Sequence, residues 1–336
     1  MASIELNNKV VLALFCTLSL CINSKEIKAK TWFGDPNLQG IWTNASLTTL
    51  ERPSHLRSWE VTEEVAFKES HKAQRESEAY DNSLEIGEEI KASRDPGGYN
   101  AAWMDQGYKF FKIKNKYRTS VIGYPKNGRL PWDPKKSRAF FQKLSPKGMK
   151  RTDHPELRGA GERCIVGFGS SGGPPMMNVL YNNHYQIVQS PGYVMIMAEM
   201  IHDTRIIRLN SKHLPKSMKP WLGDSIGFWE GNTLVVETTN FHPQHQFRAG
   251  LRHRFVITEN AKITEKFTRI SQNEIIYQFF VDDKDVYNDV WAGEMVLAAD
   301  EDRIYEYACH EGNYSMPGSL AGARRLEMEE AGLLEQ

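Results

Sequence analysis

The chain has 336 residues, and its 42 Lys and Arg balance its 42 Asp and Glu, so the formal net charge at pH 7 is zero. No basic run alternates with aromatic residues, which argues against a nucleic-acid-binding surface. The 8 Trp, 13 Tyr and 15 Phe predict an aromatic-rich interior, which suits a cavity for a small apolar or aromatic ligand. Ordinary packing within a β-sheet is the simpler explanation for any single one of them.

The N-terminus has the pattern of an export signal. Residues 10–22 are apolar, Lys9 precedes them and the polar Asn23-Ser24-Lys25 follows. An apolar run of about thirteen residues is too short to cross a bilayer and matches the hydrophobic region of a signal peptide. We therefore expect residues 1–24 to be removed, no membrane span to remain, and the mature protein to be periplasmic or secreted.

Residues 25–160 are predicted to form a short strand, a helix and an extended wrap around the body of the protein. Residues 60–95 are rich in Glu, Lys, Ala and Arg, with Thr62 as a helix start and the stretch from Asp95 to Gly98 as its stop. Because this helix is polar on most faces, we expect it to lie on the outside. Residues 99–150 show no clear periodicity and predict the wrap.

Residues 161–325 have the pattern of an antiparallel β domain. Apolar or alternating runs of about five to eight residues are separated by turn residues. The connections are too short for crossover helices, so we expect an antiparallel sheet, either barrel-like or strongly bent and similar to a lipocalin. Residues 326–336 are predicted to be a C-terminal tail. The candidate strands are Tyr185–Gln189, Tyr193–Met197, Arg205–Leu209, Thr233–Glu237, Ile263–Ile270, Ile275–Val281, Trp291–Leu297 and Arg303–Tyr307.

Two cysteines, Cys164 and Cys309, remain once the export signal is set aside. In an oxidising compartment they most simply form a disulfide that closes a long loop. Cys309 also precedes His310 and Glu311, so a thiolate with a neighbouring base or a set of metal ligands are alternatives. No HExxH or CxxC spacing supports a metal. We predict the disulfide, no metal, and His310 and Glu311 as further catalytic residues that the disulfide places at the site.

The segment from Ala198 to Arg205 is the main catalytic candidate. As the tip of a hairpin, it gathers Glu199, His202, Asp203 and Arg205 at one mouth of the barrel. A carboxylate beside an imidazole fixes its tautomer and keeps it available as a general acid or base near neutral pH. The alternative is a purely structural network of Asp, His, Arg and Glu that closes a turn.

A second group of residues is predicted to bind the substrate. Tyr181, Asn182 and Asn183 follow the Gly- and Pro-rich stretch 169–175, which can deliver hydrogen-bonding side chains to the rim, although Asn-rich turns often bond their own backbone. Ser170 and Ser171 do not stand in a Gly-x-Ser-x-Gly elbow, which disfavours a serine hydrolase. The remaining candidates for the cavity wall are Trp103, Asp105, Arg205 and Trp291.

The chain resembles a family of exported proteins of environmental bacteria that has no agreed activity. The motifs that carry the resemblance are Gly-Glu-Arg-Cys at 161–164, Tyr-Asn-Asn at 181–183, Glu-Met-Ile-His-Asp at 199–203, Trp-Leu-Gly-Asp-Ser at 221–225, Trp-Glu-Gly-x-Thr-Leu-Val-Val at 229–236, Thr-Thr-Asn-Phe at 238–241, Tyr-Ala-Cys-His-Glu-Gly-Asn-Tyr at 307–314 and Ala-Gly-Ala-Arg at 321–324. The N-terminal stretches Leu38-Gln-Gly-Ile-Trp-Thr-Asn44 and Leu50-Glu-Arg-Pro53 also look similar to the pattern of this family, so the resemblance covers nearly the whole mature chain. The chain differs from the family pattern at Gln106, which stands in place of an Arg, and at Lys262, which stands in place of a His.

Taken together, these patterns predict an exported enzyme that performs cofactor-free acid-base chemistry on a small apolar or aromatic molecule. The reaction classes that fit are isomerisation, cyclisation, elimination and hydrolysis. No Gly-rich phosphate loop is present in the sequence, so no nucleotide cofactor is expected. A non-catalytic carrier for a hydrophobic small molecule is the main alternative, and a metalloenzyme is the third.

Overall fold

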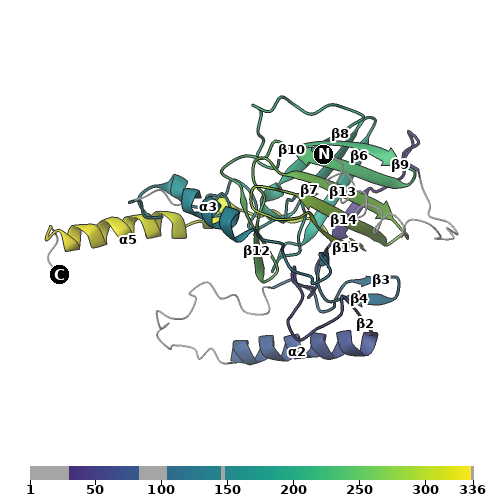
Figure 1. The fold of residues 1–336 in the computed structure, drawn as a ribbon, viewed down its shortest axis with the longest axis horizontal. Helices are drawn as coiled ribbons and strands as arrows, with labels where there is room; N and C mark the ends of the chain where they lie inside the picture. Colours follow the sequence, from purple (N-terminus) through teal and green to yellow (C-terminus); the bar gives the residue numbers. More distant parts are fainter. Residues whose placement is uncertain (1–29, 83–103, 145–147, 334–336) are drawn as a thin grey trace.

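The protein is built on a closed nine-stranded β-barrel (Figure 1). The computed structural model describes residues 30–82, 104–144 and 148–333. Strand β1 pairs with both β6 and β15, and this double pairing closes the sheet on itself. In spatial order the strands are β1 (Gly40–Thr43), β6 (His184–Ser190), β7 (Tyr193–Ala198), β8 (Thr204–Leu209), β9 (Asp224–Glu230), β10 (Thr233–Thr239), β13 (Lys262–Arg269), β14 (Glu274–Asp282) and β15 (Trp291–Asp300).

The predicted mainly β, barrel-like architecture is confirmed, with two corrections. Every candidate strand lies in the barrel except Arg303–Tyr307, which forms no strand. The backbone N–H groups of Tyr305 and Tyr307 donate to side chains at a hairpin tip instead of to a neighbouring strand. The expectation of a fully antiparallel sheet is wrong at one pair, because β8 and β9 run parallel. The long connection 210–223 makes that direction possible.

Large side chains fill the interior of the barrel. Alternate residues of each strand point inward, as in β14, where Tyr277 and Phe279 are fully buried. Trp291 is also fully buried and contacts Phe279 edge to face, with ring centroids 5.5 Å apart. This tryptophan therefore belongs to the packed core and does not line an open cavity.

Smaller sheets surround the barrel. Strand β5 (Ile122–Tyr124) adds to β15, and β11 (Phe247–Gly250) pairs with β12 (His253–Val256). Strands β2 (Glu60–Val61), β3 (Lys112–Ile113) and β4 (Lys116–Arg118) form a separate three-stranded sheet. The barrel sheet thus takes β1 and β5 from the part of the chain that precedes residue 161.

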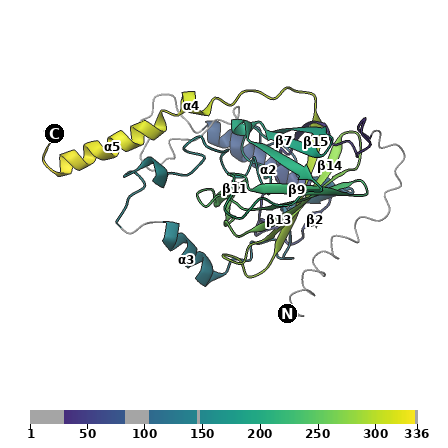
Figure 2. The ribbon, with the colours of Figure 1, turned by 90° about the horizontal axis from the view of Figure 1, so that it is seen from above.

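The helices lie outside the barrel (Figures 1 and 2). Helix α2 (Glu63–Asn82) begins directly after Thr62 and is largely exposed, as predicted, while residues 83–95 fall outside the described part. Helix α3 (Pro134–Leu144), the short α4 (Cys309–Gly312) and α5 (Ser315–Glu330) complete the set, and α5 extends away from the body. Within the described ranges, no helix is long and apolar enough to cross a membrane. The predicted signal, residues 1–24, and Trp103 lie outside those ranges.

Candidate functional site

The connection between β7 and β8 is a tight tip, Glu199–Asp203, that contains a short 3-10 turn, η3 (Met200–His202). Ile201 and His202 both adopt left-handed backbone conformations, with φ of 59° and 53°. Such a conformation is strained for a β-branched residue like Ile201. The tip is the segment that the sequence marked as catalytic, and its two carboxylates, Glu199 and Asp203, have different partners.

Glu199 belongs to an ion cluster centred on His184. The His184 ring lies 3.2 Å from Glu199 through Nδ1 and 3.1 Å from Asp300 through Nε2, and Asp105 is 3.9 Å from Nδ1. The hydrogen bond to Glu199 is the main reason why the pKa of His184 rises to about 9, despite the opposing effect of burial. The imidazole is therefore charged at neutral pH and balances carboxylates from three parts of the chain.

Glu199 is fully engaged in this cluster. Burial alone would raise its pKa, but hydrogen bonds from His184, the Tyr305 backbone N–H and Asn182 outweigh it, and the pKa falls below its usual value. The Tyr305 N–H lies 3.1 Å from Oε1. A carboxylate held ionised by several donors is suited to fixing the tip and poorly suited to accepting a proton near neutral pH.

Asp203, at the other end of the tip, has little hydrogen bonding and is buried. Its Oδ2 accepts the Gly167 N–H at 2.5 Å, which is the one hydrogen bond that the described residues give this carboxylate. Burial raises its pKa to about 6, although the Gly167 hydrogen bond and the charge of Arg248 act in the opposite direction. Asp203 therefore titrates close to neutral pH, as a proton-transfer group requires.

The glycine-rich segment 167–173 packs directly against Asp203. A Cβ on Gly172 would lie 2.8 Å from the Asp203 Cβ, and one on Gly167 would lie 2.5 Å from the Ser171 Oγ. Only glycine permits such close approach of the backbone. The segment that was expected to deliver Tyr181, Asn182 and Asn183 to the rim thus has a different role, because it encloses Asp203.

A cleft of about 440 Å³ opens beside Asp203. Apolar walls are supplied by Ile165, Trp221 and Leu222, and polar groups by His202, Asp203 and Asp224. Trp221 stacks on the His242 ring with centroids 3.8 Å apart, which fixes the indole. The His202 Nε2 accepts the Tyr307 N–H at 3.2 Å, so the neutral ring carries its proton on Nδ1. Asp203 and His202 are the two predicted catalytic residues that meet at this cleft.

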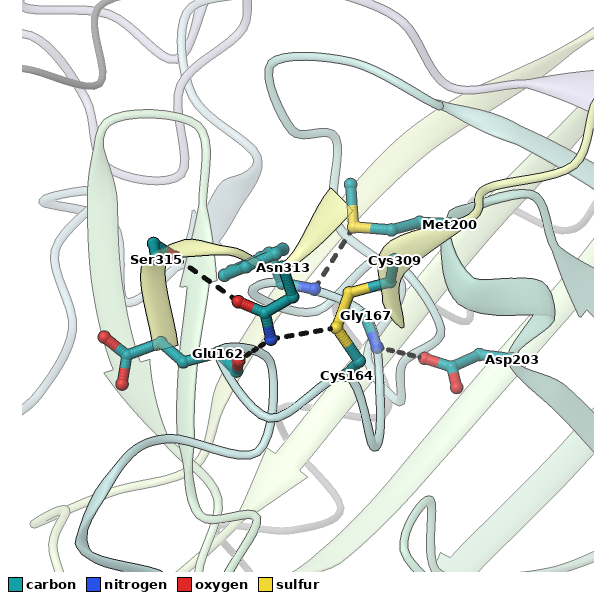
Figure 3. Close-up of a disulfide and its surroundings, with 9 residues drawn as sticks. Glu162, Cys164, Gly167, Met200, Asp203, Cys309, Asn313 and Ser315 are labelled. Atoms are coloured by element: carbon teal, nitrogen blue, oxygen red, sulfur yellow. Dashed lines mark hydrogen bonds between the residues drawn. A yellow bond between two sulfur atoms is a disulfide. The ribbon is translucent and has the colours of Figure 1, made fainter. Parts of the chain in front are cut away.

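The predicted disulfide between Cys164 and Cys309 is present and ties the C-terminal segment to the tip region (Figure 3). Beyond Cys309, the Asn313 Nδ2 donates to the Glu162 carbonyl at 2.8 Å. Residues 301–314, which we call the strap, therefore run from the ion cluster to the Gly167 segment. His310 and Glu311 lie in the strap and are exposed.

The other predicted site residues have structural surroundings. Arg205 is buried and donates both Nη groups to the Glu265 carboxylate, at 2.7 and 2.9 Å, inside the barrel. Asn183 is fully buried and donates to the Val179 and Asp105 carbonyls. Tyr181 stacks on Tyr307 of the strap, with ring centroids 6.4 Å apart. Of these three residues, Arg205 lines the cleft beside Asp203, and Asn183 and Tyr181 do not.

Sequence reasoning missed His184, Asp300, Arg248 and His245. The first of these stands inside the Tyr181-Asn-Asn-His-Tyr185 stretch that was already singled out, so its position was a usable signal. Asp300 comes 116 residues later, and nothing in the local sequence pairs the two. Arg248 and His245 carry no local sequence signal of burial, yet both side chains are buried.

Comparison with known proteins adds no assignment: no family model, no curated protein and no solved structure matches the chain. Among the described residues, no group of three His, Cys, Asp or Glu side chains is arranged to hold a metal ion. Lys262 forms an ion pair with Glu237.

Proposed function

We propose that the protein is an exported enzyme that transfers protons to and from a small apolar or aromatic molecule without a cofactor, with Asp203 as the proton-transfer group. The observation that carries the proposal is a buried carboxyl group whose pKa lies at about 6 and which lines a partly apolar cleft. A carboxyl group that populates both protonation states near neutral pH can take a proton in one step and return it in the next. Isomerisation, cyclisation, elimination and hydrolysis all contain such steps.

His202 supplies the second polar group of the proposed mechanism. Its Nε2 is occupied by the Tyr307 N–H of the strap, which leaves the Nδ1–H as the donor. Because His202 lines the same cleft as Asp203, its N–H can donate to a substrate oxygen while Asp203 removes a proton from the neighbouring carbon. The Trp221 indole, held by His242, forms the flat apolar wall on which an aromatic ring packs.

The proposed compartment is the periplasm or the exterior of the cell. The apolar run 10–22 has the pattern of an export signal, and the Cys164–Cys309 disulfide is of the kind that persists in oxidising compartments. In this setting the disulfide holds the Gly167 segment over Asp203 and does not take part in the chemistry.

The proposal is tested by hydrogen–deuterium exchange at carbon, which needs no knowledge of the natural substrate. The mature protein is incubated in D2O with a panel of aromatic ketones and aromatic 2-oxo acids, including phenylpyruvate, and loss of the exchanging C–H signal is followed by NMR. Wild type is expected to accelerate exchange of at least one compound over the buffer rate. Asp203→Asn keeps the size of the side chain and an acceptor for the Gly167 N–H, and it is expected to lower the enzymatic rate at least about a hundredfold.

The matched control is Asp289→Asn, which changes an exposed aspartate that accepts a hydrogen bond from the Tyr124 hydroxyl. It is expected to leave exchange unchanged. Equal exchange by wild type and by folded Asp203→Asn protein would reject Asp203 as the proton-transfer group. Binding of the panel without any catalysed exchange would favour the alternative function, a carrier that holds an apolar molecule in the cleft.

A further inference from the structure

Arg248, on β11, is a buried arginine with an unused hydrogen-bonding edge. Its side chain is 1% exposed, and its Nη1 donates to the Gly173 carbonyl at 3.2 Å. Its Nε and Nη2 are buried and have no hydrogen-bond partner among the described residues. A charged group left unpaired at this depth is costly, because it loses water without gaining a partner.

Two other arginines are buried to a similar degree, and each is neutralised by a glutamate. Arg205 is bound by Glu265 through both Nη groups, and the Nε of Arg118 lies 2.7 Å from Glu294. Arg248 forms no ion pair with any carboxylate of the described residues, and burial lowers its pKa to about 9. The Nε of Arg205 is also unpartnered, but a glutamate binds that guanidinium group, whereas no carboxylate of the described residues binds Arg248.

The open edge of Arg248 has a defined chemical preference. Nε–H and the adjacent Nη2–H point in parallel along one side of the planar guanidinium group. Two parallel donors at this spacing match the two oxygens of a carboxylate, which they bind in a bidentate manner. A single water molecule cannot pair with both donors in this way.

The surroundings place this edge close to the proposed proton-transfer group. Arg248 interacts electrostatically with Asp203, and the Gly173 carbonyl that it bonds belongs to the segment that encloses Asp203. His245 is buried nearby, and its Nδ1 donates to the carbonyl of Trp221, a cleft residue. Its Nε2 has no partner in the described part of the chain. Arg248 thus keeps two donors without partners among the described residues and bonds the residue next to Gly172, whose backbone lies against Asp203.

We infer that Arg248 binds the carboxylate of the substrate, so that the molecule turned over at Asp203 is a small aromatic carboxylic acid. The inference rests on the proposed function, in which Asp203 exchanges protons with a bound substrate. The open edge of the Arg248 guanidinium group indicates the chemical class of that substrate, a carboxylic acid. The aromatic ring packs against Trp221, the carboxylate pairs with Nε and Nη2 of Arg248, and the carbon between them faces Asp203. A 2-oxo acid such as phenylpyruvate has this order of groups.

The test is binding of benzoate to the mature protein, with benzamide as an uncharged probe of the same shape, at constant ionic strength. Wild type is expected to bind benzoate at least tenfold more tightly than benzamide in calorimetric titration. Arg248→Lys keeps the charge and loses the parallel donors, and it is expected to weaken benzoate binding at least tenfold. The matched control, Arg254→Lys, changes an exposed arginine on the paired strand β12 and is expected to bind as wild type does.

A measurement on wild type alone covers the case in which Arg248→Lys does not fold. The Arg248 Nε–H resonance is expected to shift on addition of benzoate and to stay in place with benzamide or with sodium sulfate. Equal binding of benzoate and benzamide, or an Nε–H resonance that benzoate does not move, would overturn the carboxylate site. Benzoate binding is measured without turnover, so the two proposals can fail separately. If benzoate does not bind at Arg248 but Asp203-dependent hydrogen–deuterium exchange is still observed, this inference alone is rejected. Benzoate binding without any catalysed exchange rejects the proposed function alone.

Discussion

Glu199 and Asp203 lie at the two ends of one hairpin tip, four residues apart, and their carboxylates meet opposite surroundings. Glu199 faces a charged histidine and accepts from a backbone N–H of the strap. Asp203 accepts one hydrogen bond from Gly167. Burial alone therefore does not mark a catalytic carboxylate. The number of donors that hold the ionised form decides whether its pKa falls, as for Glu199, or rises, as for Asp203.

The largest expected effect comes from removing the positive charge of His184, which neutralises Glu199 and its neighbouring carboxylates. His184→Gln leaves Glu199, Asp105 and Asp300 without the imidazolium, and no lysine or arginine pairs with them among the described residues. We expect a loss of about 3 kcal/mol in the free energy of unfolding at pH 6, measured by urea denaturation. The contribution of His184 is fully present below pH 6.5 and is lost as the pH rises through about 9.

The control for this prediction is another histidine held between two carboxylates. His213 lies 2.8 Å from Asp224 and 3.2 Å from Glu237, but these acids also pair with Arg208 and Lys262. His213→Gln should therefore cost only about 1 kcal/mol. Equal losses for the two variants would show that the His184 cluster has no special role in holding the tip.

A smaller effect is expected from the titration of Asp203, which makes the free energy of unfolding depend on pH. The pKa of Asp203 is raised in the folded protein, so its contribution to stability is present below pH 3.8 and is lost as the pH rises through about 6. Asp203→Asn removes this titration. The free energy of unfolding of wild type relative to the variant should fall by about 2 kcal/mol between pH 4 and pH 6. A difference that stays constant across this range would contradict the raised pKa.

Much of the fold could be predicted from local sequence. Alternating apolar runs such as Ile275–Val281 identified the strands because side chains in a strand alternate between its two faces. The Cys164–Cys309 disulfide was predicted because these are the two cysteines that remain outside the predicted export signal. Strand β9 is absent from the candidate strands, and its parallel pairing with β8 depends on the course of residues 210–223.

The site was predictable only in part. The tip sequence placed Glu199, His202 and Asp203 together, since they are neighbours in the chain, but it could not rank them. Their difference depends on contacts with His184, Gly167 and the strap, and Gly167 lies 36 residues from Asp203. The open edge of Arg248 has no local signal at all, because it is defined by the partners that the folded chain does not supply.

The most direct test of the contrast is a carboxyl-carbon NMR titration of Glu199 and Asp203 in the same wild-type sample. We expect the Asp203 Cγ to titrate with a midpoint near pH 6 and the Glu199 Cδ to titrate below pH 4.5. Assignment is made by comparison with Asp203→Asn and Glu199→Gln. A midpoint for Asp203 at or below pH 3.8, or one for Glu199 above that of Asp203, would contradict the assignment of Asp203 as the proton-transfer group and of Glu199 as a structural anchor.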